Sequence, residues 1–110
     1  MSKIEAVGDI KNHSILVTVC KVLSNRHRLR IVLHLEKKKA CSFGELLKDL
    51  NINPKVLRDH LNVLIASKLV TKSFPYGAYT LTPAGYVTKQ GLDAFAGYIT
   101  RIADVIGGNS

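Results

Sequence analysis

The sequence predicts a mainly helical domain that carries one small β-hairpin, an α+β fold class. Five segments repeat apolar residues at the spacing of amphipathic helices. Between the fourth and fifth of them, two short β-type runs flank the turn signal Pro75-Tyr76-Gly77. The 110 residues, 46% apolar and 22% charged, are typical of a single globular domain, expected over residues 1–110.

The first half of the chain predicts two helices and a short strand. The first helix is expected over about residues 10–23, and Ser24 is expected to cap a second helix that runs to about Lys37. In that second helix Leu29, Val32 and Leu33 form the expected buried stripe, with Ile31 and Leu35 also apolar. A short strand is expected over Ala40 to Ser42.

The middle of the chain predicts a helix-turn-helix over about residues 43–67. Ser42 and Glu45 form a capping box before one short helix, and Asn53 with Pro54 opens the next after a turn of three residues. The expected hairpin, about residues 69–82, follows as a wing, so the fold is a winged helix-turn-helix. Thr82-Pro83 opens a last helix, over about residues 83–106.

The helix that begins at Pro54 has two contrasting faces. Leu57, Leu61 and Leu64 share one side, as a buried stripe would. The opposite side carries groups that can read base edges in a major groove, or that simply face water; these are Lys55, Arg58, Asp59 and Asn62. His60 falls beside the leucine stripe and is expected to pack or cap rather than contact DNA.

The excess positive charge is concentrated in the middle of the chain. Residues 21–72 hold twelve Lys/Arg and four Asp/Glu, a net charge of +8, while the remainder holds four of each. Such a concentration favours a polyanionic partner. The candidates for contact with the DNA backbone are Arg26, Arg30, Lys37, Lys38, Lys39, Lys48, Lys68, Lys72 and Tyr76. For Lys37-Lys38-Lys39 an equal alternative is stabilisation of a helix C-terminus, and for Tyr76 it is packing on its own hairpin.

Three stretches of the sequence resemble the ArsR-type winged-helix transcription regulators. Leu23–Ile31 resembles the family's L-S-D-P-T-R-L-R-I, and Asn53–Leu64 followed by Leu69-Val70 is similar to its S-Q-P-T-V-S-R-H-L-K-V-L…L-V. Tyr79–Gly85 resembles the Y-x-L-T-x-x-G that ends the wing in related regulators. The resemblance, over about residues 20–85, implies DNA binding by a homodimer joined through the first and last helices.

An apolar stripe on the last helix agrees with that implied dimer. The expected dimer-interface residues are Ile15, Leu16, Val19, Leu92, Phe95, Ile99, Ile102 and Ile106. The family's metal-binding C-x-C pair is replaced by Ser42 and Gly44, and the last helix has no His for the family's other metal site. No metal and no cofactor are therefore expected. Asp59 stands where the family has an Arg, so a different base preference is expected.

The sequence thus predicts a homodimeric, sequence-specific regulator of transcription that binds double-stranded DNA. The alternatives are a chromatin-like DNA-binding protein of low specificity and a winged-helix protein-interaction module. We find no motif of an enzyme, and no apolar run long enough to cross a membrane, so we expect a prokaryotic cytoplasmic, nucleoid-associated protein. Cys20 and Cys41 are expected to be buried, reduced thiols, with a redox role for Cys41 as the alternative.

Overall fold

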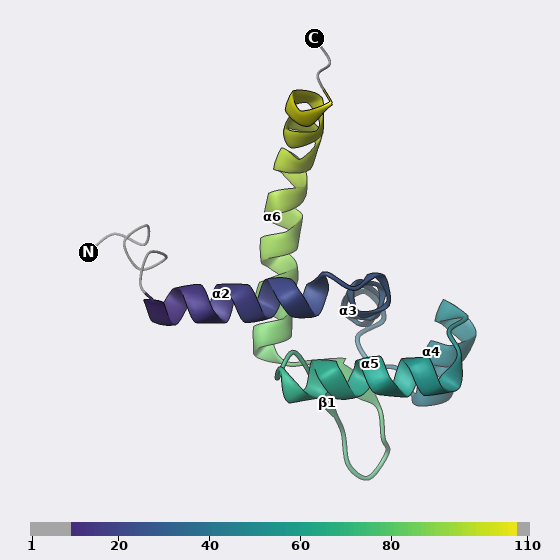
Figure 1. Cartoon of the computed structure of the whole chain (residues 1–110). Coiled ribbons are helices and arrows are strands. Elements are labelled where there is room, and N and C mark those ends of the chain that lie inside the picture. The colour runs from purple at the N-terminus through teal and green to yellow at the C-terminus, as the bar shows by residue number, and fades with distance from the viewer. Residues whose placement is uncertain (1–9, 108–110) are drawn as a thin grey trace.

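The computed structural model describes residues 10–107, with side chains from His13 onward. Within that range it has five helices and one antiparallel two-stranded sheet (Figure 1). In chain order these are α2 (Ile10–Leu23), α3 (Arg26–Lys38), α4 (Phe43–Leu50), α5 (Pro54–Ala66), β1 (Val70–Lys72), β2 (Tyr79–Leu81) and α6 (Pro83–Ile106). The winged helix-turn-helix predicted from the sequence is confirmed.

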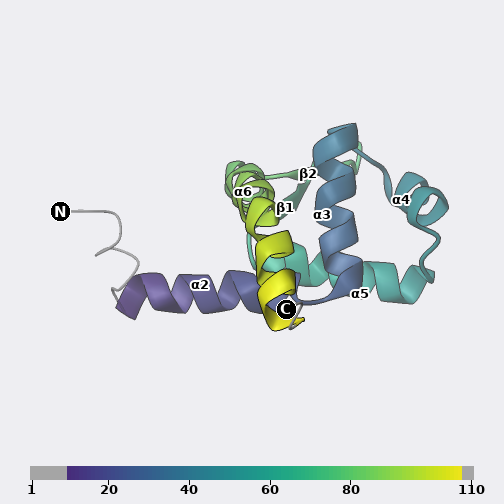
Figure 2. The same cartoon turned by 90° about the horizontal axis from the view of Figure 1, so that it is seen from above.

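Helix α3 lies at the centre of the molecule and contacts α2, α4, α5, α6 and β2 (Figure 2). Its Ile31, Val32 and Leu35 are fully buried. The predicted stripe on this helix was wrong at Leu33, which is 41% exposed. Because α3 has neighbours on several sides, more than one of its faces is apolar, and periodicity alone does not rank them.

The leucine stripe of α5 forms the other half of the core. Leu57, Leu61 and Leu64 are each at most 1% exposed, as predicted. Burying a leucine side chain contributes roughly 1.5–3 kcal/mol to folding. This stripe therefore fixes the rotation of α5 about its own axis, and with it the direction of the opposite face.

The hairpin is short and is anchored at its base. Val70 pairs with Leu81 and Lys72 pairs with Tyr79. The strand predicted over Ala40 to Ser42 is reduced to one residue, Cys41, whose backbone N–H donates to the Tyr79 carbonyl at 3.1 Å while the Tyr79 N–H donates back at 2.7 Å. The wing is thereby joined to the segment between α3 and α4.

Three of the predicted caps are confirmed and one was wrong. Ser42 with Glu45, Asn53, and Thr82 cap α4, α5 and α6. Asn25, not Ser24, caps α3: its side-chain oxygen accepts from the N–H groups of residues 27 and 28. The Ser24 hydroxyl instead donates to the Lys21 carbonyl at 2.7 Å, because it lies at the end of α2.

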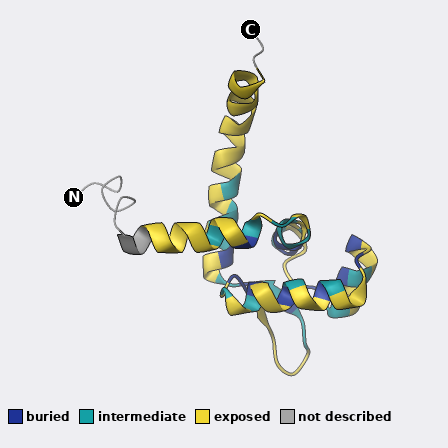
Figure 3. Cartoon of the chain, viewed as in Figure 1, coloured by how far each residue is buried: buried dark blue, intermediate teal, exposed yellow. Residues whose placement is uncertain are grey.

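Two helices project from this core and leave apolar side chains exposed (Figure 3). From Asp93 to the end of α6 every residue is exposed, and so is most of α2. Cys20, predicted to be buried, is exposed because it lies on the side of α2 that faces away from the core, whereas Cys41 is buried as expected. None of the described helices is both long and apolar enough to cross a membrane.

Candidate nucleic-acid interface

The turn between α4 and α5 sets the direction of α5. Asn51 ends α4 in the left-handed conformation, with φ of 52°. Asn53 then caps α5, its side-chain oxygen accepting from the Lys55 N–H at 2.9 Å and the Val56 N–H at 3.4 Å. A rigid turn with a capped helix start presents the first turns of α5 to a partner in a fixed orientation.

The four residues predicted to read bases all lie on the exposed face of α5. Two of them form an ion pair, because the Lys55 ammonium lies 3.2 Å from an Asp59 carboxylate oxygen, with side chains 85% and 61% exposed. A pair this exposed contributes little to stability. Both groups therefore remain able to exchange this contact for one with a ligand.

Arg58 is held by a contact that the sequence reasoning missed. Its guanidinium carbon lies 4.5 Å from the centre of the Phe43 ring, which comes from the first turn of α4. Stacking of this kind restricts the arginine and leaves its planar edge free to donate hydrogen bonds. The signal was present in the sequence as an aromatic residue just after the Ser42 cap.

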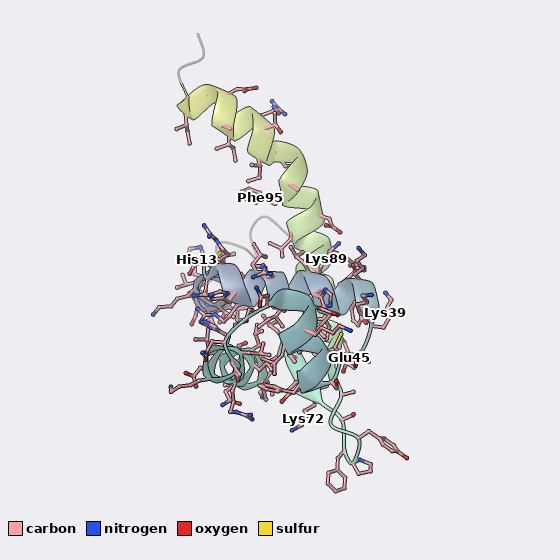
Figure 4. The ribbon with its side chains drawn as sticks, turned by 90° about the vertical axis from the view of Figure 1, so that its right-hand side faces the viewer. His13, Lys39, Glu45, Lys72, Lys89 and Phe95 are labelled. Carbon is pink, nitrogen blue, oxygen red and sulfur yellow. The ribbon has the colours of Figure 1, made fainter. Side chains whose placement is uncertain are left out.

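The hairpin tip is fully exposed and aromatic. Tyr76 is 89% exposed and Phe74 is 95% exposed, so Tyr76 does not pack on its own hairpin. The sequence reasoning did not single out Phe74. At the base of the hairpin the Lys72 ammonium lies 5.5 Å from the centre of the Tyr79 ring. Figure 4 shows Lys72 and the hairpin on one side of the helical core and Phe95 of α6 on the other.

The other basic candidates differ in how free they are. Arg26, Lys37, Lys38, Lys48 and Lys68 are exposed. Arg30 donates to the Leu50 carbonyl at 2.8 Å and so secures the end of α4. Lys39 ends α3, pairs weakly with Glu36 at 3.9 Å and lies 5.6 Å from the centre of the Tyr86 ring. Arg30 and Lys39 therefore make structural contacts within the fold.

Arg28 is half-buried, and its guanidinium makes contacts within the fold. Its guanidinium donates to the Val22 carbonyl at 2.6 Å and lies 3.1 Å from the His60 Nδ1, joining the end of α2 to α5. Burial, and then the charge of Arg28, lower the pKa of His60 below its ordinary value of 6.5. The expectation that His60 packs beside the core is confirmed.

The residues predicted to form a dimer interface lie on the projecting helices. All of them are exposed except Val19 and Leu92, which are half-buried. Val17, Tyr98 and Val105, which the sequence analysis did not single out, are also exposed on these helices. An apolar groove of about 390 Å³ separates α3 from α6, lined by Leu29, Leu33, Leu92, Asp93, Phe95, Ala96 and Ile99.

Comparisons with known proteins agree with this geometry. Residues 23–73, from the end of α2 through β1, match the sequence profile of a helix-turn-helix domain. No curated protein sequence matches the chain significantly.

Solved structures give the same fold over most of the chain. Reduced HlyU from Vibrio cholerae is 27% identical, with a TM-score of 0.66, over 77% of this chain and 92% of that one. A transcriptional regulator homologue from Pyrococcus horikoshii is 25% identical, with a TM-score of 0.65, over 81% and 97%. BpsR from Bordetella bronchiseptica, described for the regulation of its DNA binding by 6-hydroxynicotinic acid, is 21% identical, with a TM-score of 0.60, over 82% and 71%, and supports the fold alone.

The fold and the matched segment are thus those of winged helix-turn-helix transcription regulators, a class that binds DNA. Together the fold and the matched helix-turn-helix segment support a DNA-binding transcription regulator.

Proposed function

We propose that residues 1–110 form one domain that acts as a homodimeric, sequence-specific transcription regulator in the cytoplasm of a prokaryotic cell, at the nucleoid. The observation that carries the proposal is the position of the two contact elements. Helix α5 and the hairpin lie on the same side of the molecule, away from the free end of α6 (Figure 1), and the polar residues of α5 are exposed. A duplex on that side meets both elements at once.

Base reading is assigned to the exposed face of α5. Arg58, fixed against Phe43, is suited to the paired acceptors of guanine, and Asn62 to the donor and acceptor of adenine. Asp59 accepts from the amino group of cytosine when Lys55 leaves it for a phosphate or a base. The ion pair between Lys55 and Asp59 is the resting arrangement of these two groups.

Phosphate contacts are assigned to the exposed lysines and arginines around this face. Lys48, Lys68 and Lys72 lie on or next to the helix-turn-helix and the hairpin. Such contacts position the protein on the duplex without reading its sequence. Tyr76, at the exposed tip, lies along the backbone or in the adjacent groove.

The second protomer covers the apolar faces of α2 and α6. The Cα radius of gyration is 16.0 Å, against about 13 Å for a compact chain of this length. The excess comes from helices that bury little of their own apolar surface, which favours a second copy as their partner. Two recognition helices about 34 Å apart then require a near-palindromic operator.

Binding to DNA is tested first by fluorescence anisotropy with a random duplex across a range of salt. We expect affinity to fall by orders of magnitude between about 50 and 200 mM salt, because several phosphates are neutralised per dimer. Binding that is absent, or insensitive to salt, would favour the protein-interaction module instead. A cognate duplex selected from a random pool should bind far more tightly than the random one; a ratio near one would favour a chromatin-like protein.

The role of Arg58 is tested on the selected duplex. Arg58→Ala should cost roughly 1–3 kcal/mol there and relax one base position. The control is Lys72→Ala, which should weaken binding to cognate and random DNA alike and reduce the salt slope by about 1 per protomer, or about 2 for the dimer. Equal losses on both duplexes for Arg58→Ala would reassign this residue to phosphate.

Dimerisation is tested by sedimentation of the full chain. Ile99→Asp places a charge in the groove between α3 and α6 and should give a monomer. The matched control is Ala94→Asp, also exposed but about 140° further around the same helix. A dimer that survives Ile99→Asp, or that Ala94→Asp disrupts equally, would contradict this interface.

A further inference from the structure

Three side chains with metal-binding atoms meet where α3, α4 and the base of the wing join. His34 lies in the second half of α3, Cys41 in the bridge to β2, and Asp49 near the end of α4. Their ligand atoms all lie within 4.8 Å of one another. The His34 Nε2 and a carboxylate oxygen of Asp49 are already 2.9 Å apart.

The cluster combines a buried thiol with an open side. Cys41 is 2% exposed, whereas the side chains of His34 and Asp49 are 17% and 33% exposed. A cation can therefore enter from the surface between α3 and α4 and reach the sulfur at the inner end. An entry path is a requirement for any metal site that fills after folding.

The charges around the thiol favour a cation. Burial raises the pKa of the Cys41 thiol, and the carboxylates of Glu45 and Asp49 raise it further, against the opposing ammonium of Lys38. A structural reading is also available, with Cys41 as a core residue and the His34–Asp49 contact as a tie between two helices. That structural role explains why His34 contacts Asp49, but it does not explain why the Cys41 thiol lies beside them.

We propose that His34, Cys41 and Asp49 form a binding site for a divalent transition-metal cation, with Zn²⁺ as the best match. Imidazole, thiolate and carboxylate are the ligand types that Zn²⁺ accepts in tetrahedral sites. Bonds of roughly 2.0–2.3 Å place such ligands about 3.3–3.8 Å apart, so the side chains need to shift by about 1 Å. Cys41 releases its proton to solvent on binding, and water fills the fourth position.

The bound cation would join three parts of the fold. It would connect the central helix α3, the segment paired with Tyr79 of the wing, and the first helix of the helix-turn-helix. Because the cation binds the folded chain and not the same three residues in the unfolded chain, it would raise the thermal midpoint. This site is separate from the family's C-x-C positions, at which Ser42 and Gly44 stand.

The experiment uses the full chain with Cys20→Ser, which removes the exposed thiol, and Co²⁺ as the probe. We expect a sulfur-to-cobalt charge-transfer band and the intense visible bands of a tetrahedral site, both lost when one equivalent of Zn²⁺ is added. Cys41→Ala in the same background should abolish the charge-transfer band. His34→Gln and Asp49→Asn should each lose the tetrahedral bands, and His13→Gln, at an exposed histidine of α2, should change neither.

A second readout protects the test against misfolded variants. Zn²⁺ should raise the thermal midpoint of the Cys20→Ser protein and should leave that of the Cys20→Ser, Asp49→Asn protein unchanged. A cobalt spectrum without a thiolate band, or a Zn²⁺ shift of equal size in both proteins, would overturn the site. Either result is independent of DNA binding, so it leaves the proposed function as it stands.

Discussion

Gly85 gives the sharpest stability prediction, because a single added methyl group has no space there. It is the one buried residue in the described part of α6. A Cβ at this position would lie 2.2 Å from the Leu69 carbonyl oxygen and 3.1 Å from the Leu81 Cβ. Because the first contact is with backbone, no rotamer change relieves it, and α6 must move away from the base of the hairpin in Gly85→Ala.

The loss of stability in Gly85→Ala can be worked out from the hydrogen bonds that the displaced backbone groups make. The Leu69 carbonyl accepts the Thr82 N–H at 3.0 Å, and the Lys68 carbonyl accepts the Thr82 hydroxyl at 2.7 Å. Overpacking costs about 1–3 kcal/mol and a weakened hydrogen bond about 0.5–1.5 kcal/mol, while alanine regains about 1 kcal/mol of helix propensity. With a backbone clash of nearly 1 Å to relieve, we expect a net loss of about 2–3 kcal/mol in the free energy of unfolding.

The assay is urea denaturation followed by circular dichroism at one fixed protein concentration, since dimerisation makes stability depend on concentration. The control is Gly97→Ala, an exposed helical position where a Cβ meets nothing within 4 Å. That substitution should stabilise the protein by up to about 1 kcal/mol. A Gly85→Ala protein as stable as the unmodified protein would contradict the close approach of α6 to the Leu69 carbonyl.

Two further predictions concern charge. Asp59→Asn removes a negative charge from the reading face and frees Lys55, so binding to a random duplex should tighten; unchanged anisotropy titrations would show that α5 does not face the DNA. Because burial, Arg28 and His27 lower the pKa of His60 in the folded state while Asp59 opposes them, the unfolded chain binds more protons below pH 6.5. Stability should therefore fall as the pH drops below that value, and His60→Gln should lose less stability in urea titrations; equal pH dependence of both proteins would refute this.

The outward face of α5 could be predicted from the sequence for a physical reason. A helix with one buried side and one solvent-exposed side has a single apolar stripe. The positions of Leu57, Leu61 and Leu64 therefore determine where the polar residues of α5 point. Helix α3 has partners on several sides, and the same reasoning misplaced Leu33. Adjacent Ser24 and Asn25 are both good caps, and only the path of the chain after α2 selects Asn25.

The cluster of His34, Cys41 and Asp49 could not be predicted from the sequence. Its members are separated by a helix end, a bridge and a second helix, so their meeting depends on how α3 and α4 cross. The sequence also does not reveal which charged side chains make contacts within the fold, as Arg28 shows. It counts toward the basic segment, yet its guanidinium is directed at Val22 and His60 inside the fold.

The division of α5 into a leucine side and a polar side has a consequence for how such proteins diversify. Lys55, Asp59 and Asn62 are exposed and lie outside the core, so we expect replacing them to leave the fold intact. Under the proposed base-reading role, such replacements change only the preferred DNA sequence. Arg58 differs from these three because its partner Phe43 lies in another helix, so a change at Arg58 also removes a contact between α4 and α5. Under that proposed role, a lineage built on this fold would change its preferred operator by single substitutions at three positions without cost to the core.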